Sequence, residues 1–477
     1  MRYIQGIDRQ QTTLLPEMVD DYIAENNSVR FIDVFVDGLD IQKLGFKYSQ
    51  PKITGRMPYN PADLLKLYIY GYLNKLRSSR RLERATYQNI ELIWLLHKLH
   101  PDFKTISDFR KDNSKSLKQV CREFTLLCKK LDLFGCELIA IDGSKFSASN
   151  SNRRNYTKNK LEKLIKKIDE QVDDYLKQMD HGDQAEASVL NISAEELNQK
   201  IEQLKKRKDR YEDLQSQIEQ SSEPQVSLTD PDSRMMRTQQ GKDVAYNVQI
   251  VTDSKHKLIV THEVTNEIND LKQLHPMAVQ AKEVLETEEL DVVADAGYFD
   301  RENLKECQDE TINTYVPRPN RSHNKSRGLY TNEDFVYDSQ GDTYQCPDGQ
   351  TLTFRGYRKR KESGQIEKKY TTHACYMCQQ RSKCTRSKTT RYIYRWEHED
   401  VLEQLSQRMK ENPEKINLRK SLVEHPFGTM KRAMEHHYFL TRGIEKVSGE
   451  MSLSVLCYNL KRVLNIMNFK ELLLAVR

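Results

Sequence analysis

The 477-residue sequence contains no run of apolar residues long enough to cross a bilayer, which takes about 20 residues. Its first residues, Met-Arg-Tyr-Ile-Gln-Gly, lack the apolar core of a secretory signal peptide. Both absences argue against a membrane or secreted protein, so we expect a cytosolic chain. In that compartment its nine cysteines should stay reduced unless they bind metal.

A large net charge is also missing, since the formal charge is only +6. The charge is unevenly distributed, however. Residues 346–395 carry thirteen lysines and arginines against three acidic residues, and residues 51–85 carry eight against two. A solvated surface would explain one such patch, but two patches, together with the carboxylates described below, favour a nucleic-acid partner. With 37% hydrophobic residues, the chain can still form packed cores, and its length predicts two to four folding units.

The first 130 residues are predicted to be helical. Asn60 is placed to cap a helix, a second helix is expected over 80–97, and a third from about Ser107 to Leu131. Arginines three to four residues apart in this region could present a stripe of charge to DNA phosphates. These candidate DNA-binding residues are Arg77, Arg80, Arg81 and Arg84.

An apolar run over 136–141 predicts a strand that ends at Asp142. Further along the chain we expect, in the order strand, strand, helix, strand, the segments 243–251, 257–264, 270–286 and 290–295. The last strand ends at Asp295, and a helix is expected from Asp300. This order of elements is the one that an RNase H-like mixed sheet requires.

Between these core segments lie two predicted insertions. Residues 155–220 carry apolar residues at heptad spacing in two stretches, which predicts an antiparallel helical hairpin; a dimerising leucine zipper is the alternative. A polar linker over 221–240 follows it. The second insertion, 318–395, is expected to be basic, rich in β-strand and too polar to build its own core, and a helical C-terminus follows it.

Three acidic residues are candidates for catalysis. Taken alone, Asp142 and Asp295 would most often be turn or helix caps, but Glu424, expected near the start of a C-terminal helix, supplies a third carboxylate. Three such groups can hold two Mg²⁺ or Mn²⁺ ions for in-line displacement at phosphorus. Lys431 follows Glu424 by seven residues, and with Arg419 it could contact the flanking phosphates.

Four of the nine cysteines fall within forty residues, in the pattern Cys346, then Cys375-x2-Cys378-x5-Cys384. Four thiolates suit tetrahedral Zn²⁺ and leave no open position for catalysis, so we predict a structural zinc site. Free thiols are the alternative. A zinc-stabilised basic insertion would be placed to clamp DNA.

Several strings resemble the DDE transposases of bacterial insertion sequences. They are Ile-Asp142-Gly-Ser, Ala-Tyr246-Asn247-Val-Gln, Ala-Asp295-Ala-Gly-Tyr and Val-Glu424-His-Pro-Phe-Gly-Thr-Met-Lys431. The resemblance covers nearly the whole chain, because residues 60–110 are similar to the helical N-terminal domain of these enzymes. It implies that Asp142, Asp295 and Glu424 form the catalytic triad. Tyr246 and Asn247 could line the DNA groove, although alternation along the strand makes one or two of the residues Tyr246, Asn247 and Gln249 simple core or surface residues. The tyrosine that related enzymes often show shortly before the glutamate is missing here.

The resemblance implies a multidomain α+β or α/β protein. We expect a DNA-binding domain over 1–130, a catalytic core in three pieces (131–154, 221–317 and 396–477), the hairpin over 155–220 and the zinc insertion over 318–395. It implies strand cleavage and strand transfer on double-stranded DNA, namely the element's own ends and a target, by a homodimer assembled on DNA in the bacterial cytoplasm, at the nucleoid. A metal-dependent structure-specific nuclease and a catalytically silent DNA-binding derivative are the alternative functions.

Overall fold

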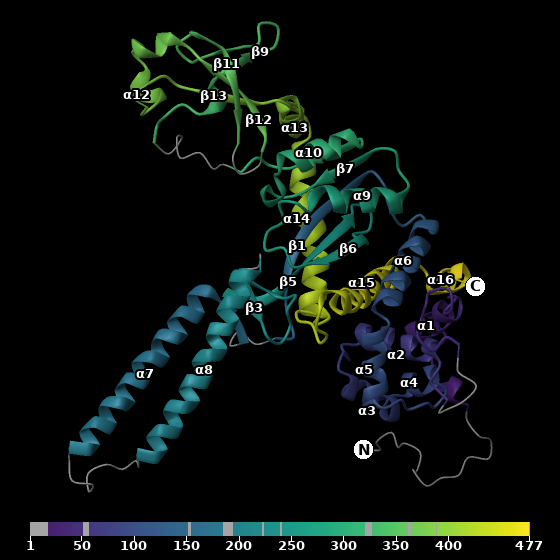
Figure 1. The fold of residues 1–477 in the computed structure, drawn as a ribbon. Helices are drawn as coiled ribbons and strands as arrows, with labels where there is room; N and C mark the ends of the chain where they lie inside the picture. The colour runs from purple at the N-terminus through teal and green to yellow at the C-terminus, as the bar shows by residue number, and fades with distance from the viewer. Residues whose placement is uncertain are drawn as a thin grey trace, which may run out of the picture. The chain divides into compact units, whose positions relative to one another are not determined.

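The computed structural model describes residues 18–50, 57–150, 154–184, 194–221, 224–238, 241–319, 327–360, 364–387 and 389–476. The chain divides into two compact units. The first contains residues 1–135, 142–268 and 422–477, and the second contains 136–141 and 269–421. The whole is a mixed α and β, multidomain protein, and Figure 1 shows its elements.

The N-terminal part of the first unit is helical, as the sequence predicts. Its elements are η1 (Val19–Tyr22), α1 (Ser28–Asp37), α2 (Pro61–Leu73), α3 (Ser79–Gln88), α4 (Ile90–Leu95), α5 (Phe103–Asp112) and α6 (Ser114–Lys130). Two of the expected helices are each broken in two. Asn89 is extended and its side chain caps α4, and Asn113 separates α5 from α6. The Asn89 Oδ1 competes with helical hydrogen bonds by accepting from the amides of Glu91 and Leu92. The Asn113 side chain instead donates to the Phe109 carbonyl and accepts from the amide of Lys47.

Helix α2 begins where the sequence predicts, with the Asn60 side chain accepting from the amide of Ala62 at 3.0 Å. It is buried on nearly every side, not along one face. Two helices that cover it are α1 and α15 (Ile444–Ile466), a C-terminal helix that is itself buried from Val447 to Leu460 and packs on α2, α6 and β6. Gly449 permits this packing, since a Cβ there would meet the backbone of Ser114 at 2.6 Å. Helix α16 (Phe469–Val476) ends the chain beside α1.

A six-stranded mixed sheet has the strand order β4-β5-β1-β7-β8, with β6 paired to β5. In the first unit, β4 (Arg234–Thr238), β5 (Gly241–Asp253) and β6 (Ile259–Thr265) are antiparallel. In the second unit, the start of β1 (Leu138–Ser147) runs parallel to β7 (Leu290–Val293), which is parallel to β8 (Ile312–Tyr315). The predicted hairpin of 243–251 and 257–264 is therefore present. The expected linker over 221–240 is wrong in part, because it contains β4 and the short strand β3 (Gln225–Ser227).

Helices α7 (Lys158–Gln184) and α8 (Ala194–Gln220) run side by side as a long hairpin in the first unit (Figure 1). Their contact is apolar, formed by Leu161 and Ile168 of α7 with Tyr211, Leu214 and Ile218 of α8. At the base, β2 (Asn155–Thr157) pairs with β3. The heptad residues of α7 therefore find their partners within the same chain, which removes the reason for a zipper.

The second unit continues from its strands into helices. These are α9 (Leu274–Leu285), η3 (Ala296–Tyr298), α10 (Arg301–Asp309), α13 (Glu399–Glu411) and α14 (Pro413–Gly428), of which α14 ends in the first unit. Between α10 and α13 lies a second sheet, with the order β13-β12-β11-β10-β9. Its elements are η4 (Asn332–Asp334), β9 (Val336–Asp338), β10 (Thr343–Gln345), β11 (Thr351–Lys359), β12 (Ile366–Thr371), η5 (His373–Tyr376), α12 (Arg381–Cys384) and β13 (Ile393–Trp396).

This second sheet corrects one expectation. The insertion was expected to be too polar for a core, yet Phe335, Tyr344, Leu352, Tyr370 and Ile393 form a buried apolar cluster on one face of the sheet. Alternation along the strands explains this, because every second residue of a polar-looking strand can still face a core. Across the described ranges, no helix has the length and apolar character needed to cross a bilayer.

Candidate active site

Asp142 lies inside a strand and not at its end. Strand β1 continues through Gly143 to Ser147, which corrects the expected end of the strand. The three residues before Asp142 are buried, while Asp142 itself is half-buried, and its Oδ1 accepts a hydrogen bond from the Gly143 amide at 3.0 Å. The strand therefore fixes the backbone of this carboxylate in the sheet and leaves its side chain at the surface.

Lys431 approaches the same strand from the C-terminal part of the chain. Its Nζ donates to Ser144 Oγ and to the Lys145 carbonyl, both at 2.7 Å, and lies 4.4 Å from the centre of the Phe146 ring. Burial lowers the pKa of Lys431 to about 8, helped by the charge of Lys145 and opposed by that of Asp142. The first unit thus brings Lys431 to the strand of Asp142, although Lys431 and Ser144 are 287 residues apart in sequence.

Glu424 is an exposed residue of α14, next to the buried pair Leu422 and Val423. It lies late in the helix, which corrects the expected position near a helix start. The helix begins earlier because Pro413 suits the first helical turn, where its missing amide hydrogen is not needed. After Gly428 the helix changes to the π-helical turn η6 (Thr429–Ala433), so Glu424 and Lys431 are not on one continuous α-helix.

Asp295 belongs to the second unit, whereas Asp142 and Glu424 belong to the first. It follows β7, as the sequence predicts, and its Oδ1 accepts from the Gly297 amide at 2.7 Å, capping η3. A Cβ at position 297 would lie 2.8 Å from that oxygen, so a larger residue there would displace the Asp295 carboxylate. Arg419, the other proposed phosphate contact, is half-buried in the part of α14 that belongs to the second unit.

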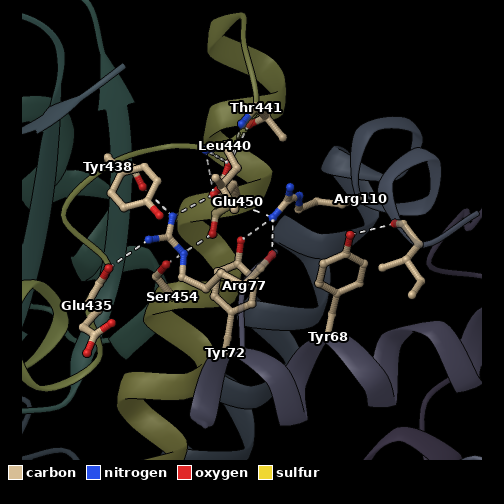
Figure 2. A network of polar contacts seen from close by, with 11 residues as sticks. Tyr68, Tyr72, Arg77, Arg110, Glu435, Tyr438, Leu440, Thr441, Glu450 and Ser454 are labelled. Carbon is tan, nitrogen blue, oxygen red and sulfur yellow. Dashed lines mark hydrogen bonds and ion pairs between the residues drawn. The ribbon is translucent and has the colours of Figure 1, made fainter. Parts of the chain in front are cut away.

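The proposed arginine stripe divides into two groups. Arg80, Arg81 and Arg84 are exposed on α3. Arg77 is only 6% exposed, and its guanidinium donates to backbone carbonyls and to a carboxylate of the first unit (Figure 2). Arg77 is therefore not available to contact DNA, because it is buried and both of its Nη atoms donate to groups inside the protein.

Two further candidate DNA contacts are also buried. Tyr246 and Asn247 lie on β5 with no exposed surface. The Tyr246 hydroxyl donates to Asp230 at 2.8 Å, and the Asn247 amide donates to the Glu267 carbonyl at 3.2 Å. Both side chains support the sheet, and the expectation that they line a DNA groove is not met. Polar residues such as Asn247 suggest a surface position in the sequence. The unbroken run of buried residues in β5 shows instead that the strand is covered on both faces.

Cys346, Cys375, Cys378 and Cys384 line one small cavity of about 20 Å³ in the second unit. Burial raises the pKa of Cys384, and the other three thiols raise it further against the effect of Arg391. The Cys378 thiol donates to Asp348 at 3.3 Å, and Cys346 Sγ accepts from the Gln350 amide at 3.3 Å. The four thiols are thus neighbours.

Neighbouring thiols do not by themselves make a metal centre. Within the part of the chain that the structure describes, no group of three or more histidine, cysteine, aspartate or glutamate side chains is arranged to hold a metal ion. This statement includes the three candidate catalytic carboxylates and the four cysteines.

Two family models match the sequence. One, described as a transposase domain (DUF772), matches residues 17–112, and the other, described as a transposase DDE domain, matches residues 345–464. The first covers the helices from η1 to α5, and the second covers the four cysteines, Glu424 and Lys431. Neither covers Asp142 or Asp295. No curated protein matches the sequence.

One solved structure, the cryo-EM structure of a piggyBac transposase synaptic complex with hairpin DNA, aligns with 94% of this chain and 78% of that chain. The identity is 8% and the TM-score is 0.31, which is too low to support an argument about this chain. The two family matches carry the identification. They show a transposase domain over residues 17–112 and a transposase domain of the DDE type over residues 345–464. The resemblance to DDE transposases is confirmed, and the chain functions in DNA transposition.

Sequence reasoning missed Ser144, which holds Lys431, and Glu450, which holds Arg77. A signal existed for Glu450. It is the single charged residue in the stretch from Val447 to Leu460, and a buried acid in such a helix needs a cationic partner.

Proposed function

We propose that the chain cleaves DNA at the ends of its own insertion element and joins those ends to target DNA, using Asp142, Asp295 and Glu424 as metal-binding carboxylates on an RNase H-like core. The observation that carries this proposal is the anchoring of Lys431 on Ser144 and Lys145, beside Asp142. It supports a shared site for the first aspartate and the segment that contains the glutamate.

The residues suit Mg²⁺ or Mn²⁺ by their chemistry. All three candidates offer carboxylate oxygens, which hard divalent cations prefer. The Oδ1 atoms of Asp142 and Asp295 each accept from a nearby backbone amide, that of Gly143 within β1 and that of Gly297 in η3, so little side-chain freedom remains to be lost on binding. Bound metal would supply an activated water or 3′-hydroxyl and stabilise the leaving oxygen.

The basic residues of the site have a separate task. Lys431 and Arg419 would hold the phosphates that flank the scissile bond. A lysine with a pKa of about 8 is partly neutral in mildly basic solution, and a nearby phosphate would raise that pKa because it stabilises the ammonium form. DNA binding should therefore take up a proton at Lys431 above pH 8.

The test is cleavage of DNA that carries the flanks of the element's own gene. Asp142→Ala, Asp295→Ala and Glu424→Ala should each abolish Mg²⁺-dependent cleavage while folding and DNA binding persist. Glu414→Ala is the matched control, because Glu414 is an exposed carboxylate of the same helix as Glu424. If one triad variant keeps near wild-type cleavage, that residue is not a metal ligand.

Joining distinguishes the alternatives. A structure-specific nuclease would cleave the same DNA without joining it to a target, and a silent DNA-binding derivative would do neither. We infer that a homodimer assembles on the DNA, in the bacterial cytoplasm at the nucleoid. Light scattering with and without end DNA tests that assembly.

Exposed Arg80, Arg81 and Arg84 of α3 support recognition of the element's ends by the N-terminal helices. Removing residues 1–130 would expose α15, which packs on α2 and α6, so charge reversal on α3 is the better test. Arg80→Glu combined with Arg84→Glu should weaken end binding strongly. If end specificity is unchanged, recognition lies elsewhere in the chain.

We also propose that the four cysteines bind one structural Zn²⁺, supported by the cavity that all four line. Metal analysis should find one zinc per chain, lost in Cys375→Ser and in Cys378→Ser. Because the sheet has its own apolar core, these variants should stay folded elsewhere and show weaker DNA binding. Cys307→Ser, at a buried cysteine in α10, is the control and should keep the zinc. A zinc-free wild type with full DNA binding would exclude this site.

A further inference from the structure

Arg77 and Glu450 are the centre of a buried ion cluster in the first unit (Figure 2). Arg77 Nη2 donates to Glu450 Oε1 at 3.0 Å, and both side chains are less than 10% exposed. Arg110 lies 3.8 Å from the same oxygen and donates to the Tyr72 hydroxyl at 3.0 Å. The carboxylate also accepts from the backbone amides of Leu440 and Thr441 and from the Thr441 hydroxyl. The cluster therefore fixes a backbone segment as well as side chains.

That segment, residues 435–441, directly follows the π-helical turn that contains Lys431. Arg77 holds it at two more points, since Nη1 donates to the Glu435 carbonyl at 3.0 Å and Nη2 donates to the Tyr438 carbonyl. The Arg77 guanidinium also lies over the Tyr438 ring, 4.9 Å from its centre. One side chain thus binds two carbonyls three residues apart and a carboxylate, a task that needs the planar, multi-donor head of arginine.

The same segment is hydrogen bonded to the strand of Asp142. The Ser147 amide donates to the His437 carbonyl at 3.2 Å, and the Phe439 amide donates to the Ser147 carbonyl at 2.9 Å. Ser147 is the last residue of β1, five positions after Asp142. Residues 437–439 therefore form an isolated parallel bridge with Ser147, at the end of the candidate catalytic strand.

Arg77 is also close to α3 along the chain, because it lies two residues before the first residue of that helix. Helix α3 carries the exposed arginines proposed to bind the element's ends. The contacts thus run without a break from α3 through Arg77 to residues 435–439, and from there to β1.

We propose that Arg77 is a positioning residue, which aligns the strand of Asp142 with the DNA held on α3. The inference rests on the proposed function for the role of Asp142. Arg77 does not touch DNA or metal; it acts through residues 435–439. Its loss should impair cleavage of bound ends more than the binding of those ends.

The test uses the full-length Arg77→Lys variant, with Arg122→Lys, at an exposed arginine of α6 in the same unit, as the matched control. Lysine keeps the charge but cannot hold both carbonyls and Glu450 at once. We expect binding of end DNA within about twofold of wild type and single-turnover cleavage of bound DNA slower by about 10- to 100-fold, the effect of a small misplacement of a catalytic group. Arg122→Lys should leave both the binding of end DNA and the cleavage rate of bound DNA unchanged. Equal losses of binding and cleavage in Arg77→Lys, or no loss of cleavage, would overturn the proposal.

Hydrogen exchange gives a readout that does not depend on activity. In Arg77→Lys the amides of Ser147 and Phe439 should exchange about tenfold faster, while those of α6 stay protected. If the lysine variant does not fold, Thr441→Val carries the test, since it removes one donor to Glu450 at nearly constant volume, and both amides should again exchange faster. Unchanged exchange at Ser147 and Phe439 would refute the link even in a protein that does not cleave. Absent cleavage by wild type, with the exchange result as expected, would instead refute the proposed function alone.

Discussion

Two carboxylates in different units share the same lowered pKa but are held in opposite surroundings. Burial alone would raise the pKa of Glu450, yet Arg110, Arg77 and the Thr441 hydroxyl lower it to about 2. In the insertion sheet, the hydroxyls of Tyr370 and Tyr337, followed by Lys368, lower the pKa of Asp342 to about 2.

Their environments differ in exposure. The Glu450 side chain is 1% exposed, and the Asp342 side chain is 41% exposed. Water therefore screens the contacts of Asp342 and can replace them, whereas nothing replaces those of Glu450. Equal pKa values do not mean equal contributions to stability. The first unit depends on its buried charges, and the insertion sheet carries charge on a surface that its tyrosine core stabilises independently.

The largest expected effect is at Glu450. Glu450→Gln leaves Arg77 and Arg110 buried without their counter-charge, and should lower the free energy of unfolding by about 3–5 kcal/mol. Urea denaturation of the first unit measures it. As a control, Glu263→Gln breaks a surface pair with Lys118 in the same unit and should cost less than about 1 kcal/mol. Similar costs for both variants would remove the distinction between buried and surface charge.

Acid should destabilise the first unit at a pH above the range in which Glu450 is protonated. Burial lowers the pKa of His436 and of His262 to about 3 each. Both rings are neutral in the folded protein. Their contribution to the free energy of unfolding is therefore complete above the unfolded pKa of about 6.5 and is lost as the pH falls towards 3. Between pH 7 and pH 5 each should cost about 2 kcal/mol of unfolding free energy.

Urea denaturation at pH 7 and at pH 5 measures this loss of unfolding free energy. The variant His436→Phe distinguishes the contribution of His436 from that of His262. His436 packs edge-on against Tyr72, a contact that phenylalanine preserves, so about half of the pH dependence should disappear. A pH dependence that the substitution leaves intact would mean that His436 is protonated in the fold. Glu450 lies outside this window, because its contribution is lost only from about pH 4.5 towards 2.

Asp342→Asn tests the stability contribution of the exposed carboxylate. Asparagine can still accept from the two tyrosine hydroxyls, and the Lys368 pair, at 3.1 Å, is partly exposed. We expect a loss of about 1 kcal/mol or less in the stability of the insertion sheet. A loss as large as that of Glu450→Gln would show that exposure does not determine these contributions.

The smallest effect on stability is expected on α3. Arg81→Ala should change the free energy of unfolding by less than about 0.5 kcal/mol, because the side chain is exposed. Its effect should appear in DNA binding instead, where each lost phosphate contact reduces the slope of log affinity against log salt by about 0.9. An unchanged slope would remove Arg81 from the proposed DNA surface.

Periodicity and turn chemistry predicted much of the fold. The Asn60 cap, the β5 and β6 hairpin, and the apolar runs that became β1 and β7 all follow from local patterns. Breaks at Asn89 and Asn113 were missed because an asparagine in a helical pattern can either continue the helix or cap the next one. Contacts with residues outside each helix hold both side chains: the Asn89 amide donates to the Tyr70 hydroxyl, and the Asn113 Oδ1 accepts from the Lys47 amide.

The candidate site was predicted less completely. Motifs identified Asp142, Asp295, Glu424 and Lys431, because these depend on local strings. Arg77 looked identical to Arg80 and Arg81 in sequence, since its burial is caused by Glu450, which lies 373 residues away. The burial of Tyr246 and Asn247 also depends on residues distant in sequence. Alternation along β5 does not reveal that the strand is covered on both faces.

The short strands β2 and β3 clamp the base of the α7–α8 hairpin, which begins and ends at neighbouring points in the first unit. Each helix is 27 residues long, so equal numbers of residues can be removed from both without changing the strands at the base. The outer half of the hairpin could accordingly be exchanged for a fluorescent protein or an affinity module. Such a chimaera would allow the enzyme to be followed on DNA in living cells while the strand of Asp142 keeps its native surroundings.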